Sequence, residues 1–168
     1  TPGVGVLDLG VLGKSSSGAK GSEGHAINNA GQVVGESTAK NVVGGRAFRY
    51  TDGVGMVDLG ILPTYQPSQS GRSFATDINS AGHVVGFSTY GGQKWYSPDW
   101  HPFLWTETSG MLDLWTLISN PPEDSTDPYI STSGLRIKEP AQGASFGPIG
   151  GTIRTSGQIQ PFILTPNP

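Results

Sequence analysis

The chain has no cysteine, which excludes disulfide bonds and metal sites built on thiolates. Charged residues make up only 14% of its 168 residues, and the 10 Lys and Arg are fewer than the 13 Asp and Glu. We therefore expect no nucleic-acid partner, because such partners need a basic surface. No apolar run approaches the length of a membrane-spanning helix, so no membrane span is expected either.

Glycine and proline are abundant, with 26 and 13 residues, which indicates many turns. The apolar stretches are short and lie between glycine-rich segments, a pattern typical of strands, and no segment has the periodicity of an amphipathic helix. The length suits one compact domain, residues 1–168. Residue 1 is Thr and no signal peptide is visible, so we interpret the start as a mature or trimmed end.

The clearest pattern is an internal repeat. Val-Leu-Asp-Leu-Gly at residues 6–10 recurs as Met-Val-Asp-Leu-Gly at 56–60 and as Met-Leu-Asp-Leu-Trp at 111–115. A longer signature, with Ile-Asn and then Gly-x-Val-Val-Gly, occupies 26–38 and returns at 77–89. A fixed spacing of this size is typical of repeat architectures.

A third motif, Ala-Phe-x-Tyr and its variants, gives each module a further strand. Every module then carries four short strands, so the sequence predicts an all-β fold. It consists of about three four-stranded, antiparallel, blade-like repeats in a β-propeller-like arrangement. The third motif lies at 46–51, 101–106 and 160–165, and the repeat units span about 11–60, 61–115 and 116–168, with strand 6–9 in addition.

The turn between the first two strands of each module has a recognisable composition. Gly31 and Gly82 follow Asn-x-Ala in their modules. We predict that both have positive φ, which glycine adopts without a steric penalty. Asn28 and Asn79 are expected to hold these turns with their side chains.

The third module is degenerate, and the ends of the chain bear on how it is completed. Residues 134–149 lack the Ile-Asn-x-x-Gly signature. The chain opens on a fourth-type strand, 6–9, and closes on a third-type strand, 160–165. We expect these two strands to pair, within one chain or across a homodimer, because pairing removes two open sheet edges.

The combined motifs, Ile-Asn-x-x-Gly-x-Val-Val-Gly, Ala-Phe-x-Trp and Met-x-Asp-Leu-Gly, resemble the HAF repeat, a bacterial module of predicted extracellular proteins. The resemblance covers residues 6–115 well and 152–166 in part. It implies secretion or display at the cell surface and a propeller-like arrangement of blades. It implies no assigned chemistry.

The acidic segment between the second and third modules interrupts the repeat. Its Glu123, Asp124 and Asp127 could supply three oxygen ligands to a hard cation such as Ca²⁺. A solvated acidic loop is the simpler interpretation. Asp77 and Asn79 are further candidate ligands for Ca²⁺.

The other candidate residues for chemistry are explained more simply by structure. Asp8, Asp58 and Asp113 recur before Leu, where an Asp side chain commonly accepts backbone hydrogen bonds in a turn. The three histidines occupy different module positions and form no His-x-x-x-His pair, so a zinc site is not expected.

The longer loop of the second module is rich in aromatic residues, namely Trp95, Tyr96 and Trp100. Such side chains suit binding of a sugar face or of another apolar surface. They could equally pack over the end of a sheet. Both interpretations are open.

Two functions follow from these features. The first is an extracellular β-repeat module for binding or assembly through its inserted loops, with a small molecule, a glycan or a protein surface as partner. The alternative is a Ca²⁺-dependent hydrolase of lactones or related esters, an idea that depends on analogy with propeller enzymes. Ca²⁺ is the cofactor that the second function needs, and no organic cofactor is expected.

Overall fold

The computed structural model describes residues 5–40, 42–63, 71–90, 99–117, 129–130, 135–155 and 158–166. In these residues the chain forms three antiparallel sheets, here called A, B and C, and one short 3₁₀ helix, η1 (Leu114–Leu117). The all-β prediction is therefore confirmed. No helix among the described residues is long and apolar enough to cross a membrane.

Each sheet is formed from strands that follow one another in the sequence. Sheets A and B are four-stranded meanders, as the repeat predicts. In sheet C both β9 and β10 pair with β11, which then pairs with β12. Sheet A contains β1 (Ser22–Ile27), β2 (Val33–Thr38), β3 (Gly45–Thr51) and β4 (Gly55–Asp58). Sheet B contains β5 (Ser73–Ile78), β6 (Val84–Tyr90), β7 (Asp99–Thr106) and β8 (Gly110–Asp113). Sheet C contains β9 (Tyr129–Ile130), β10 (Arg136–Ile137), β11 (Ile149–Thr155) and β12 (Gln158–Leu164).

The turns between the first two strands follow the prediction. Gly31 and Gly82 have φ of 76° and 78°. The Asn28 side-chain oxygen accepts hydrogen bonds from the backbone N–H groups of Ala30 and Gln32, both at 3.0 Å. Asn79 accepts from the N–H of His83 in the same way. The predicted role of both asparagines in holding these turns is confirmed.

The glycine of the Val-Val-Gly signature is required by a β-bulge in the neighbouring strand. The register of β5 against β6 shifts between Ala75 and Asp77, and this shift brings the backbone of β5 close to Gly86. A Cβ atom at Gly86 would lie 2.1 Å from the carbonyl oxygen of Phe74. Only glycine therefore fits this position without displacing the backbone.

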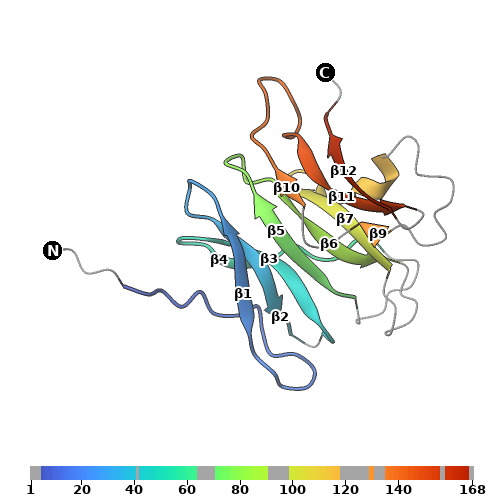
Figure 1. Ribbon diagram of the computed structural model, residues 1–168. Coiled ribbons are helices and arrows are strands. Elements are labelled where there is room, and N and C mark those ends of the chain that lie inside the picture. The colour runs from blue at the N-terminus through green and yellow to red at the C-terminus, as the bar shows by residue number, and fades with distance from the viewer. Residues whose placement is uncertain are drawn as a thin grey trace.

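The three sheets pack face to face, with sheet B between sheets A and C (Figure 1). Two separate cores result. The core between sheets A and B contains Val34, Ala47, Leu59, Leu62, Ala75, Ile78, Val84, Phe103 and Trp105. The core between sheets B and C contains Val85, Phe87, Leu104, Leu114, Leu135, Ile137 and Ile149.

The degenerate third module keeps its first strand. In the complete modules the backbone N–H of Asn28 or Asn79 bonds the carbonyl oxygen of the residue just before the next strand, Gln32 or His83. Lys138 N–H bonds Pro148 O, just before β11, at 2.9 Å in the same way. Lys138 thus takes the place of the asparagine. Lysine has no acceptor to hold a tight turn, so the connection to β11 is longer and contains its own turn, closed by Ala144 N–H on Ala141 O at 3.0 Å.

The expected pairing of residues 6–9 with residues 160–165 does not form within this chain. Residues 5–10 have no strand structure, and Val6 is fully exposed. They project from sheet A on the side away from sheet C (Figure 1). The intrachain alternative is wrong because sheet B, with both of its cores, separates the two segments.

Candidate functional site

A pocket of about 560 Å³ opens where sheet A meets sheet B, at the end of the stack where β1 begins and β2 ends. We call it the serine-loop pocket, after the loop 14–21 that forms one wall. Ten of its fifteen lining residues have polar side chains. The lining residues are Ser15, Ser16, Ser17, Ala19, Lys20, Gly21, Ser22, Glu23, Glu36, Ser37, Thr38, Val43, Gly44, Gly45 and Arg72.

Hydroxyl groups of β2 hold this loop against sheet A. Thr38 donates its hydroxyl hydrogen to Gly13 O at 2.8 Å and accepts from Gly21 N–H at 3.2 Å. Ser37 accepts from Leu12 N–H at 3.0 Å. Ser15 accepts from Ala19 N–H at 3.1 Å, which closes the tip of the loop. The loop wall is therefore shaped by the sheet before any ligand arrives.

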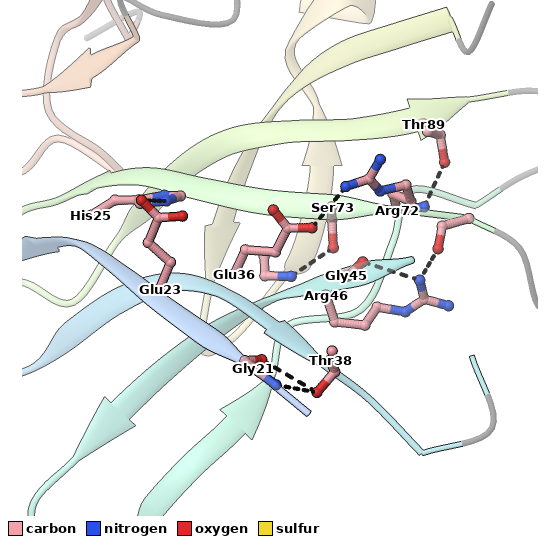
Figure 2. A network of polar contacts seen from close by, with 12 residues as sticks. Gly21, Glu23, His25, Glu36, Thr38, Gly45, Arg46, Arg72, Ser73 and Thr89 are labelled. Carbon is pink, nitrogen blue, oxygen red and sulfur yellow. Dashed lines mark hydrogen bonds and ion pairs between the residues drawn. The ribbon is translucent and has the colours of Figure 1, made fainter. Parts of the chain in front are cut away.

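An ion pair between the two sheets forms the opposite wall. Arg72, just before β5, lies 3.2 Å from Glu36 of β2, and the two side chains are 52% and 29% exposed (Figure 2). The backbone N–H of Arg72 bonds the Thr89 hydroxyl at 3.0 Å, which fixes the start of the side chain. Both charged groups are partly open to solvent, so a ligand can reach them.

Two glycines make room for this ion pair. A Cβ atom at Gly44 would lie 2.3 Å from Cγ of Arg72, and one at Gly45 would lie 1.8 Å from the Oε1 atom of Glu36. The pair was missed from the sequence, although a signal was present. The repeat places Phe87, a core residue, where the first module has Glu36. A charge at that position indicates a local departure from the core pattern.

A buried arginine beneath the ion pair joins the two sheets. Arg46 is only 7% exposed, and its guanidinium donates to the carbonyl oxygen of Gly71 (Figure 2). Ser73 accepts from the N–H of Ala47 at 2.9 Å beside it. Burial lowers the pKa of the Arg46 guanidinium, and the nearby Asp58 carboxylate acts in the opposite direction. These contacts position Arg72, which follows Gly71 directly.

The remaining charged groups at the pocket offer hydrogen-bond acceptors and donors. Glu23 is 81% exposed and lies 3.9 Å from Nε2 of His25. Nδ1 of His25 lies 2.6 Å from Ala75 O, so the ring is tied to sheet B. Carboxylates at Glu23 and Glu36 and cations at Lys20 and Arg72 can together hydrogen-bond a ligand rich in hydroxyl groups.

Of the predicted metal ligands, the two that the structure describes, Asp77 and Asn79, do not line this pocket. Asp77 and Asn79 lie near the β5–β6 turn, at the end of sheet B opposite the pocket, which we call the turn end. There they hydrogen-bond to sheet C. Asp77 accepts from Ile137 N–H at 3.0 Å, and Asn79 donates to Lys138 O at 3.0 Å. No group of three or more His, Cys, Asp or Glu suited to a metal ion occurs in the described part of the chain.

Several of the predicted site residues lie outside the described ranges. These are Glu123, Asp124 and Asp127 of the acidic segment, and Trp95 and Tyr96 of the aromatic loop. Calcium binding by the acidic segment stays a prediction, as does ligand binding by the two aromatic residues. The strand ends that flank the aromatic loop, Tyr90 and Asp99, pair at the same end of the stack as the serine-loop pocket.

Trp100 is the one predicted ligand-binding aromatic that the structure describes. It is half-buried and packs against the core between sheets B and C. Its ring makes an edge contact with Phe74, with 5.3 Å between centroids. This arrangement corresponds to the packing interpretation of Trp100.

The repeated aspartates have the structural role that their position before Leu indicates. Asp58 accepts from Gly60 N–H at 2.8 Å, and Asp113 accepts from Trp115 N–H at 2.9 Å. The second oxygen of Asp113 lies 2.8 Å from Nδ1 of His101. His101 occupies the position that Arg46 has in the first module, where the charge of the module aspartate, Asp58, acts to raise the pKa of the guanidinium.

A pH-sensitive group lies at the turn end of sheet B. Nδ1 of His83 is buried and has no hydrogen-bond partner among the described residues. Burial lowers the pKa of His83, and the Glu139 carboxylate opposes that effect. Hydrogen bonds from the Ser80 side chain and backbone lower the pKa of Glu139.

These shifts predict a loss of stability in acid. Because the pKa of His83 is lower in the folded chain, the unfolded chain binds more protons below about pH 6.5. The free energy of unfolding should therefore fall as the pH drops below that value. Glu139 adds a further fall below its usual pKa of 4.5, for the same reason. Thermal unfolding midpoints measured from pH 7 to pH 4 would show both steps.

The His83→Gln variant separates the two groups, because glutamine is the residue at the matching position of the first module, Gln32. The variant should lose the fall that begins below about pH 6.5 and keep the one at lower pH. Equal pH dependence of wild type and variant across the upper range would contradict the assignment to His83.

Comparison of the chain with family models, with curated proteins and with solved structures finds no match.

Proposed function

We propose that the chain is an extracellular β-repeat module that binds a glycan at the serine-loop pocket, without catalysis. The three sheets serve as propeller-like blades that hold the loops at one end of the stack. The observation that carries the proposal is the Glu36–Arg72 ion pair, which spans two sheets and lines the pocket with both charges partly exposed.

The chemistry of the pocket supports a sugar as ligand. Neighbouring hydroxyl groups of a sugar both donate and accept hydrogen bonds. Carboxylate oxygens of Glu23 and Glu36 accept them, and the guanidinium of Arg72 donates a planar pair. A cavity of about 560 Å³ is within the range of small-ligand sites. The site also has one wall already fixed by Ser37 and Thr38, which reduces the ordering cost of binding.

The test is a binding screen followed by calorimetry. The 168-residue chain is applied to an array of neutral and acidic oligosaccharides, and the best ligand is titrated. A double variant, Glu36→Gln with Arg72→Gln, should weaken binding by about 10- to 100-fold, because hydrogen bonds to charged groups contribute about 1.5–3 kcal/mol. Circular dichroism checks that the variant is folded.

A matched control removes an ion pair elsewhere. Glu107→Gln breaks the Arg49–Glu107 pair, which lies at the turn end of the stack. It should leave sugar binding unchanged. The proposal fails if no sugar binds, or if the double variant binds as tightly as Glu107→Gln.

A further inference from the structure

We infer that copies of this chain associate head to tail through their β-structure. Residues 5–9 of one copy would add as a new edge strand beside β12 of a second copy, and sheet C of that second copy would pack against the outward face of sheet A of the first. This inference is independent of the pocket and of the proposed sugar binding.

The first observation is a strand without its sheet. Residues 6–10 repeat the motif that forms β4 and then β8 in the complete modules. Here the same motif has no strand structure, and Leu7 is 67% exposed. Leu9 is half-buried, whereas the matching Leu59 and Leu114 are 5% and 0% exposed and fill the two cores.

The second observation is that the connection after this segment already has the geometry of the link between sheets. Gly10 has φ of 79° and bonds Asp8 at 2.9 Å, as Gly60 has φ of 83° and bonds Asp58 at 2.8 Å. Leu12 N–H bonds a β2 serine hydroxyl on sheet A at 3.0 Å, and Leu62 N–H bonds the matching serine on sheet B at 2.9 Å.

This agreement fixes where the segment leads. Residues 58–62 run from sheet A, where β4 is a strand, to sheet B. Residues 8–12 make the same contacts with sheet A that residues 58–62 make with sheet B. The segment before them is therefore positioned to join a sheet that packs on the outward face of sheet A. Figure 1 shows the segment leaving the molecule in that direction.

The third observation is an open position in sheet C. Sheets A and B each have a fourth strand beside the Ala-Phe-x-Tyr or Pro-Phe-Leu-Trp strand. In the described part of the chain β12, the matching strand of sheet C, has a neighbour on one side, β11. An open edge of this kind is a template for strand addition.

The fourth observation is that the two outer faces of the stack carry the two halves of one interface. On sheet C, Ile159 and Ile163 are 62% and 67% exposed. They match Trp100 and Leu104, which pack in the core between sheets B and C. The face of sheet C that points away from sheet B thus exposes apolar residues at positions that pack in a core in sheet B.

Sheet A carries the complementary half. Ile27 is 67% exposed and Val33 is half-buried, whereas the matching Ile78 and Val84 are 5% and 0% exposed in the core between sheets A and B. Because the two halves differ and lie at opposite ends of the stack, a second copy meets the first head to tail. Such contacts produce rings when the rotation closes and fibres when it does not.

The strand register gives an experiment with atomic specificity. In sheets A and B, Arg49 pairs with Val57 and Leu104 pairs with Leu112. The matching pair across two copies is Ile163 with Leu7. The chain has no cysteine, so single cysteines report this contact without background.

Two single-cysteine variants, Leu7→Cys and Ile163→Cys, are mixed and mildly oxidised, because paired strand positions meet the distance that a disulfide requires. We expect a species of two chains on a non-reducing gel. Leu7→Cys mixed with Ile159→Cys, which is out of register, should give much less of it. The double variant should give chains linked end to end rather than a closed single chain.

Sedimentation velocity of the unmodified chain supplies the second measurement. The average mass should rise with protein concentration. Leu7→Lys or Ile163→Lys should raise the dissociation constant by at least about tenfold, since each places a charge in the joint. Val54→Lys is the control, because Val54 is 72% exposed but lies in the β3–β4 turn.

Three outcomes overturn the inference. The first is a single chain at every concentration with no selective disulfide. The second is association that Leu7→Lys and Ile163→Lys leave as strong as Val54→Lys does. The third is preferential formation of Leu7–Leu7 or intrachain Leu7–Ile163 disulfides, which would indicate a symmetric dimer or closure within one chain.

Discussion

Replacing Gly86 by alanine is expected to lower the free energy of unfolding by about 3 kcal/mol, the upper end of the usual cost of overpacking. The added methyl would lie 2.1 Å from the Phe74 carbonyl oxygen and 2.8 Å from the Phe103 ring. Neither neighbour can move easily, because the first belongs to the bulged backbone of β5 and the second is fully buried. Urea unfolding followed by circular dichroism measures the change.

Gly150→Ala is the matched control for this experiment. Gly150 also lies in a strand, β11, but the closest neighbour of a Cβ atom there is 3.7 Å away, an ordinary contact. The control should be neutral or slightly stabilising, because alanine restricts the unfolded chain more than glycine does. If both variants lost the same stability, a general cost of removing strand glycine would explain the result and the steric argument would be wrong.

Replacing Asn79 by alanine is expected to cost about 3 kcal/mol as well, because it leaves buried hydrogen-bonding groups without partners. Asn79 is 2% exposed. Its oxygen accepts from His83 N–H and its nitrogen donates to Lys138 O, both at 3.0 Å. The variant therefore loses the turn between β5 and β6 and a bond between sheets B and C together.

A second variant tests whether burial sets this cost. Asn28→Ala makes the same change at the more exposed turn of the first module, so it should lose less stability than Asn79→Ala. Equal losses for Asn79→Ala and Asn28→Ala, measured by urea unfolding, would show that burial at Asn79 does not matter.

The repeat was enough to predict the strands of the first two modules, because each motif combines a strand with the turn residue that ends it. Asn28 and Gly31 identify one such turn by their chemistry alone, and the same holds for Asn79 and Gly82. The third module was harder to read. Lys138 replaces the asparagine, so the motif disappears while the backbone hydrogen bond that defines the position remains.

The candidate pocket could not be predicted from the repeat, because it depends on differences between modules. Glu36 and Arg72 are far apart in the sequence and meet only because sheet B packs on sheet A. Gly44 and Gly45 leave the space for them, which is visible only when the side chains are placed. The side chains of Asp77 and Asn79 hydrogen-bond to sheet C, a contact that the repeat does not indicate, and calcium binding by them stays a prediction.

The separation of the hydrophobic core into two layers has a consequence for how the molecule unfolds. Sheet B contributes to both layers, whereas sheets A and C each contribute to one. Such an architecture behaves as a linear array, in which cooperativity passes only between nearest neighbours. Partial unfolding would then begin at an outer sheet and stop at an intermediate that retains the other two. The central sheet would be the last to exchange its amide hydrogens with solvent.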